Sequence, residues 1–237
     1  MYNNREEKTL MNLYTNLEYN IYTEDISPSA ISKILPNCNS LNDTKENRVY
    51  ETIKPITLYI GNTLHDTIDW NNGDLLDTLN FVKTARGYQN GEFSMTKKQA
   101  DKNNVSVTDM HKLHTEILVN GLKWLDEVVL NPAMQKYELY IHKVQIGHYV
   151  YSGTADVVQD NGDGTFSVFD FKCYNGVSEK ENQSHFNQLM IYAIMLMAYG
   201  YKIKTVAIYN PVMETIQTRA LTDEMVQDFI DTQLLEF

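Results

Sequence analysis

The sequence predicts an α/β fold in which helices are layered on a β-sheet and a mostly helical segment precedes them. Alternation of apolar and polar residues marks strands between residues 137 and 172, and helical spacing marks the segments on both sides. From residue 108 onward the predicted order is helix, three strands, helix, strand, helix. This order is typical of a layered α/β domain with its functional residues at one end of the sheet.

The first 107 residues are expected to be mostly helical. Ser27 and Pro28 are typical of a helix start, because serine caps free backbone amides and proline fits the first helical turn. This helix is predicted to run to Leu35. A second helix is predicted over 56–69, and it carries the motif Gly61-x-x-x-His65.

The remaining residues supply a helix-and-strand core. Gly121 lies on the apolar stripe of its predicted helix, where it either weakens the helix or lets another element pack closely. The turn at 160–164 is rich in residues that tolerate a left-handed backbone, which indicates a hairpin. The predicted helices cover 108–129, 183–199 and 222–235, and the predicted strands cover 137–143, 147–159, 165–172 and 204–210.

Length and composition limit the class of protein. The chain has 237 residues, of which 43% are hydrophobic, enough for one domain with a sizeable core. No run of 18 apolar residues occurs, and the N-terminus lacks a signal-peptide pattern. With Cys38 and Cys173 as the only cysteines, neither a disulfide framework nor a four-cysteine metal site is expected. We therefore expect a cytoplasmic protein without a membrane span.

The formal net charge of −11 argues against a nonspecific nucleic-acid coat protein, which needs clustered Lys and Arg. A nuclease is still compatible with this charge, because metal-binding carboxylates add negative charge and a local basic strip can follow DNA. The candidate strip is formed by Lys83, Arg86, Lys97, Lys98 and Lys102. An ordinary solvated surface is the alternative explanation for these residues.

Two aspartates and a lysine lie on the predicted hairpin. Asp156 and Asp170 are on neighbouring antiparallel strands, so they can lie side by side. Two like charges in this position repel, and a divalent cation, which prefers carboxylate oxygens, relieves the repulsion. Lys172 shares the face of Asp170, because side chains two apart on a strand point the same way. Alternatively, one aspartate is a surface residue and the other caps a turn.

The next helix carries Gln188 and Tyr192 one turn apart, and therefore on one face. If that face meets the hairpin, Gln188 can hold the lysine or a water, and Tyr192 can contact a DNA phosphate or lie in the core. Carboxylates that hold a cation, with a lysine that stabilises developing negative charge, are suited to phosphodiester hydrolysis.

The motifs Gly153-x-x-Asp156, Asp170-x-Lys172 and Gln188-x-x-x-Tyr192 resemble the RecB-type branch of the PD-(D/E)XK nucleases. Upstream, the segment 26–35 followed by Gly61-x-x-x-His65 resembles the opening of the RecE-like and lambda-type phage exonucleases. The resemblance covers roughly residues 25–200, and the order and spacing of the motifs carry it. One departure is Cys173, because Thr or Ser commonly follows the lysine in the family.

The resemblance implies a single nuclease domain over 1–237, with a helical N-terminal extension over 1–107 and a restriction-endonuclease-like core over 108–237. It implies Mg²⁺ or Mn²⁺ as cofactor. The implied metal-binding residues are His65, Glu138, Asp156, Asp170 and Phe171, the last through its backbone carbonyl. Lys172 would orient the attacking water and stabilise charge on the phosphate, while Glu138 would bind the metal or polarise that water. Gln188 and Tyr192 would support the site and the DNA backbone.

The implied activity is that of a metal-dependent DNA exonuclease acting 5′ to 3′ on linear duplex DNA in phage-type recombination. Its implied partners are DNA and a single-strand annealing protein, and a phage-encoded protein would act in the host cytoplasm. The implied assembly is a trimer or tetramer, with a monomer that threads single strands as the alternative. One alternative is a single-strand-end exonuclease or an endonuclease of the same fold. Another, from a different class, is a catalytically degenerate module that only binds DNA or a protein.

Overall fold

The structure is a computed structural model that describes residues 25–44, 135–147, 149–174 and 176–235, together with eight single residues between 101 and 124. The predicted helix over 56–69, with His65, and the candidate basic strip lie outside these residues. Of the helix predicted over 108–129, the five described positions, which include Gly121 and Trp124, are helical. None of the helices in the described ranges is long and apolar enough to cross a membrane.

A five-stranded mixed sheet forms the centre of the described structure, with its strands in the order β1-β2-β3-β4-β5. The first three strands are antiparallel neighbours, β4 runs parallel to β3, and β5 runs antiparallel to β4. The strands span Gln135–Ile146 (β1), Tyr149–Asp160 (β2), Phe166–Phe171 (β3), Ile203–Asn210 (β4) and Thr215–Ala220 (β5). This arrangement confirms the α/β class.

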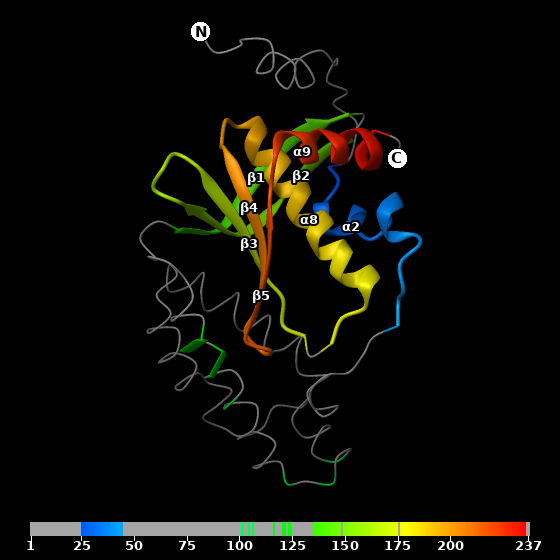
Figure 1. Cartoon of the computed structure of the whole chain (residues 1–237), viewed down its shortest axis with the longest axis vertical. Helices are drawn as coiled ribbons and strands as arrows, with labels where there is room; N and C mark the ends of the chain where they lie inside the picture. The colour runs from blue at the N-terminus through cyan, green and yellow to red at the C-terminus, as the bar shows by residue number, and fades with distance from the viewer. Residues whose placement is uncertain are drawn as a thin grey trace.

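A long helix, α8, crosses the sheet and packs against β1 to β4, as Figure 1 shows. Ser178 caps its start by accepting a hydrogen bond from the Glu181 amide at 3.1 Å. All residues from 189 to 196 are buried, because the helix is enclosed by the sheet and by α2 and α9. The described helices are α2 (Pro28–Ile31), η1 (Pro36–Cys38), α8 (Glu179–Ala198), α9 (Asp223–Phe229) and the π-helix η4 (Ile230–Leu234).

The predicted elements need correction at three points. The helix that begins at Pro28 ends at Ile31 instead of Leu35, and a separate 3-10 turn begins at Pro36. Proline fits the start of this turn because its fixed φ suits a first helical position. The strand β5 was not predicted, so the order after β4 is strand and helix rather than helix alone. The final helix begins after the Thr222 cap as predicted, but its last turn is a π-helix.

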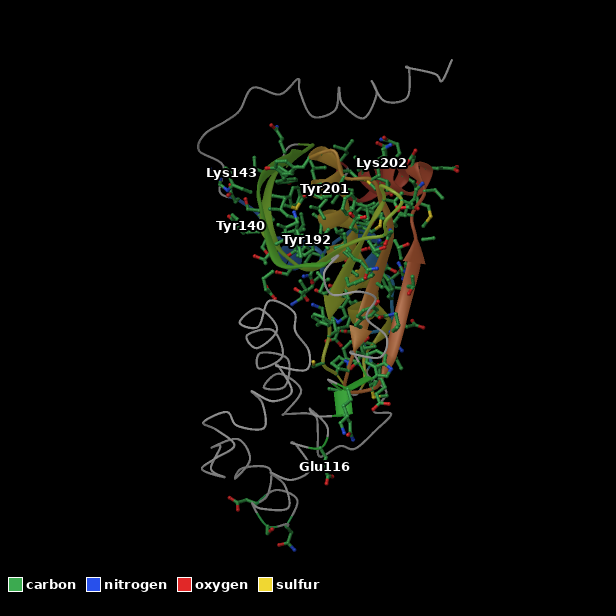
Figure 2. The ribbon with its side chains drawn as sticks, turned by 90° about the vertical axis from the view of Figure 1, so that its left-hand side faces the viewer. Glu116, Tyr140, Lys143, Tyr192, Tyr201 and Lys202 are labelled. Atoms are coloured by element: carbon green, nitrogen blue, oxygen red, sulfur yellow. The ribbon has the colours of Figure 1, made fainter. Side chains whose placement is uncertain are left out.

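The hairpin of β1 and β2 is bent. Its register shifts between Ile141 and Val144, so one strand carries an extra residue there. Glu138 and Lys143 in β1 have positive φ values of 46° and 41°, which is uncommon for residues with a side chain. Bulges of this kind bend and twist a strand pair, and Figure 2 shows the pair as a strongly curved ribbon. The bend lets both strands contact α8.

Candidate catalytic site

The strands β2 and β3 part at the two predicted aspartates. Their ladder runs from the pair Asp160 and Phe166 to the pair Val157 and Phe169, and the next position places Asp156 opposite Asp170. Here the Asp156 carboxylate accepts a hydrogen bond from the Phe171 amide at 2.8 Å. The Asp156 side chain thus accepts the hydrogen bond that a backbone carbonyl of β2 would accept in a regular ladder. The Phe171 amide of β3 therefore keeps a partner although the two strands separate.

Asp170 and Lys172 form an ion pair in a buried setting. The Lys172 Nζ atom lies 2.7 Å from Asp170 Oδ2, and the Asp170 side chain is only 2% exposed. Apart from this ion pair, neither carboxylate oxygen of Asp170 accepts a hydrogen bond from a described residue. A buried carboxylate normally has several partners. This one therefore has unused capacity for a cation.

Both aspartates act on the lysine. Burial alone would lower the pKa of Lys172, but the nearby carboxylates of Asp170 and Asp156 outweigh burial and raise it. The ammonium group is therefore charged at neutral pH. The sequence prediction that these three side chains converge is consistent with this geometry.

The phenylalanines of β3 lie on the face of the sheet opposite to Asp170 and Lys172. Phe169 stacks on Tyr209 of β4 with ring centroids 4.7 Å apart, and Phe171 approaches the same ring at 6.3 Å. Trp124 meets Tyr209 edge-on. This aromatic packing holds β3 in place and directs Asp170 and Lys172 toward α8.

Tyr192 of α8 is buried against β2. A Cβ atom on Gly153 would lie 3.0 Å from the Tyr192 hydroxyl oxygen and 3.0 Å from Pro28 Cδ. Burial raises the pKa of Tyr192 to about 12, although a hydrogen bond with Gln188 opposes this rise. The position favours the core alternative for Tyr192, which lies inside the molecule in Figure 2. Gln188 is thus hydrogen-bonded to a core tyrosine.

The sequence analysis missed His185, which lies on α8 one turn before Gln188. Its ring stacks on that of Tyr174, with centroids 5.9 Å apart and planes 10° apart. Burial, together with Lys172, lowers the pKa of His185 to about 4, against the opposing effect of Asp170. The imidazole is therefore neutral at pH 7. Helical spacing from Gln188 and Tyr192 was the available signal, because positions 185, 188 and 192 share one face.

Glu138 lies on β1, next to the strand that carries Asp156. Its neighbours Tyr137 and Leu139 pair with Val157 and Ala155, so Glu138 stands across from Asp156. Within the described ranges, no three His, Cys, Asp or Glu side chains lie close enough together to share a metal ion. Glu138 is therefore not grouped with Asp156 and Asp170, whereas these two aspartates both lie near Lys172. His65, the remaining predicted ligand, lies outside the described residues.

Cys173 follows the lysine at the edge of the site. Burial raises the pKa of its thiol to about 12, with Lys172 acting in the opposite direction. The side chain thus remains a neutral thiol at pH 7 and does not serve as a nucleophile.

We compared the sequence with protein-family models and with curated proteins. No family model matches it, and no curated protein matches it. The site must therefore be judged on its own geometry.

Proposed function

We propose that the chain is a metal-dependent DNA exonuclease with a PD-(D/E)XK-type core. The observation that carries the proposal is the convergence of Asp156, Asp170 and Lys172 where β2 and β3 separate. The order of elements supports it too, since three strands followed by a helix and a further strand is the order expected for the core that the resemblance implies.

The residues fit a divalent cation. Asp170 has a buried carboxylate with unused acceptor capacity, and Asp156 lies opposite it on the next strand. These two side chains and the Phe171 carbonyl would hold the ion, with His65 as the further ligand that the resemblance implies. When bound, Mg²⁺ or Mn²⁺ would neutralise charge on the phosphate and make water a stronger nucleophile.

Side chains of the protein would supply the remaining stabilisation of the reaction. The Lys172 ammonium, kept charged by two carboxylates, would stabilise the negative charge that builds on the phosphate during in-line attack by water. Asp170 fixes the position of that ammonium through the 2.7 Å contact. Gln188 and Tyr192 would hold α8 against β2 so that the site keeps its shape.

A catalytically degenerate module that only binds DNA or a protein is the second candidate. It is favoured by one observation: the two aspartates already have partners in the protein, Asp156 in the Phe171 amide and Asp170 in Lys172. In this alternative the ion pair would stabilise the fold and the chain would not cleave DNA.

The test is cleavage of end-labelled linear duplex and single-stranded DNA with Mg²⁺, Mn²⁺ or EDTA. We expect metal-dependent cleavage that falls about a hundredfold or more in Asp170→Asn and in Lys172→Met. Matched controls are Asp228→Asn on α9 and Lys136→Met on β1, both exposed and both expected to retain activity. Absence of cleavage with either metal, or full activity in Lys172→Met, would reject the proposal. Linear against closed circular DNA then separates an exonuclease from an endonuclease.

A further inference from the structure

A second surface, away from the aspartates, combines aromatic rings with positive charge. We call it the tyrosine–lysine surface. It is formed by Tyr140, His142 and Lys143 of β1 and by Tyr199, Tyr201 and Lys202 between α8 and β4. Tyr140, Lys143, Tyr201 and Lys202 all lie in the upper part of the molecule in Figure 2.

The two segments are in contact. The Tyr199 hydroxyl donates a hydrogen bond to the His142 carbonyl oxygen. The rings of Tyr140 and His142 lie 6.0 Å apart, and Tyr201 packs edge-on against Phe166 at 4.9 Å. The end of α8 and the bulged part of β1 thus form one continuous surface.

The aromatic rings are unusually exposed. Tyr140 is 60% exposed and Tyr199 is 58% exposed, and they are the two most exposed large apolar side chains in the described ranges. Burial normally stabilises such rings. Their exposure in two adjoining segments is typical of a surface that binds a ligand with flat apolar faces.

The two segments of this surface carry lysines and no carboxylates of their own. Segments 139–147 and 199–205 contain no Asp or Glu, although the chain carries a net charge of −11. Lys143 and Lys202 are exposed, and no ion pair is recorded for either within the described ranges. Carboxylates of neighbouring elements lie nearby: Asp25 accepts a hydrogen bond from Ser152, and Asp163 interacts with Lys204 of β4. The charged side chains within these two segments are therefore cationic, although the chain as a whole is acidic.

The backbone fixes the position of Lys143. Its φ of 41° places it in the bulge of β1, and its amide donates a hydrogen bond to the Ser152 hydroxyl at 2.9 Å. The lysine is thus presented from an ordered edge strand next to Tyr140.

We propose that the tyrosine–lysine surface binds single-stranded DNA, as a site separate from the catalytic one. This proposal builds on the proposed nuclease function, because a strand left or entered by an exonuclease needs a place to lie. Bases stack on the exposed rings, and Lys143 and Lys202 contact phosphates. Duplex DNA fits less well, because paired bases are already stacked on one another.

The test measures binding of a fluorescent oligothymidine to the full chain by anisotropy, in EDTA so that no cleavage occurs. We expect Tyr140→Ala to weaken binding at least about fivefold, the effect of losing one stacked base. Lys143→Gln should reduce the slope of log K against log salt by about 0.7, the value for one phosphate contact on a single strand. Matched controls are Lys136→Gln at the start of the same strand and Met225→Ala on α9, both exposed and both expected to bind as wild type.

Wild-type affinity and salt slope in Tyr140→Ala and Lys143→Gln would overturn the proposal, as would failure of the wild-type chain to bind the oligonucleotide. Tighter binding of a duplex, or a concentration-dependent dimer that Tyr140→Ala abolishes, would also overturn it in favour of backbone recognition or a protein interface. Cleavage assays keep the two proposals apart. Failure of the wild-type chain to bind the oligonucleotide, with cleavage intact, rejects only this surface, and binding without cleavage rejects only the nuclease.

Discussion

At the scale of single residues, Gly153 determines how closely α8 approaches β2. A Cβ atom here would lie 3.0 Å from Tyr192 Cε1, 3.0 Å from its hydroxyl oxygen and 3.0 Å from Pro28 Cδ, so these neighbours would have to move by a few tenths of an ångström. Three segments that are far apart in the sequence meet at this point. The motif glycine thus has a packing role next to the motif aspartate.

Gly153→Ala should therefore destabilise the protein by about 1–2 kcal/mol, because overpacking outweighs the gain expected from replacing glycine in a strand. The measurement is the urea midpoint of unfolding. In a Tyr192→Phe background the same change should cost less, because one of the three crowded atoms is gone. Equal cost in both backgrounds would mean that Tyr192 does not make the contact.

His185 makes the stability of the folded protein depend on pH. Its pKa is lowered from 6.5 to about 4 by burial and by Lys172, so folding favours the neutral ring. The unfolded state then binds more protons than the folded state between these values, and stability falls as pH decreases from 6.5 toward 4. Two and a half pKa units correspond to about 3 kcal/mol at most.

From pH 7.5 to pH 4.5 we expect the free energy of unfolding to decrease by about 2 kcal/mol less in His185→Gln than in wild type. Urea unfolding of both proteins at both pH values measures the two decreases. Carboxylates that titrate in this range are common to both proteins and cancel in the comparison. Parallel pH profiles for the two proteins would show that the ring is not held neutral in the fold.

At the scale of elements, the sequence predicted what depends on local pattern. The strands β1 to β4, the turn after Asp160 and the Thr222 cap follow from alternation, turn residues and capping. Strand β5 was missed because its residues are mostly polar and exposed and lie at a sheet edge, where no apolar alternation is needed. The length of α2 was overestimated because the end of this helix depends on contacts with α8, which the local sequence does not reveal.

The same limit applies to the site. Asp156, Asp170 and Lys172 were predictable because strand periodicity and a short hairpin fix their relative positions. His185 and the stacked Tyr174 come together through the path of the chain between β3 and α8, which no periodic pattern encodes. The capacity of Asp170 for a cation became visible only from its burial.

Gly121 lies where a helical segment packs closely against Pro211, directly after β4. Of the two interpretations from the sequence, close packing is supported, because a Cβ atom would lie 2.6 Å from the Pro211 carbonyl oxygen. Alanine in a free helix would stabilise by about 1 kcal/mol. At this position we expect Gly121→Ala to destabilise by at least about 1 kcal/mol instead, since a backbone oxygen cannot move aside easily.

The matched control for Gly121 is Asn120→Ala, at the preceding helical position, which is exposed. It should be neutral or slightly stabilising, because alanine is the better helix former. Thermal or urea unfolding of both variants decides the question, and a stabilised Gly121→Ala would exclude the contact with Pro211.

At the scale of the whole molecule, the net charge of −11 conflicts with a polyanionic substrate. Contacts with phosphates are local, whereas repulsion from the total charge extends over a Debye length, about 10 Å at 0.1 M salt and about 30 Å at 0.01 M. Added salt therefore screens the repulsion first and weakens the contacts afterwards. The proposed substrate is compatible with the chain only if local cations dominate at the contact surface.

We accordingly expect the cleavage rate at limiting DNA and constant Mg²⁺ to pass through a maximum as KCl increases from about 10 mM to about 300 mM. The double variant Asp223→Asn, Glu224→Gln removes two exposed carboxylates of α9 and should move the maximum to lower salt. A matched control is Thr222→Ser, which keeps the helix cap and the charge and should leave the maximum in place. A rate that falls steadily from the lowest salt in all three proteins would show that local cations alone govern the encounter with DNA, because long-range repulsion would then have no measurable effect.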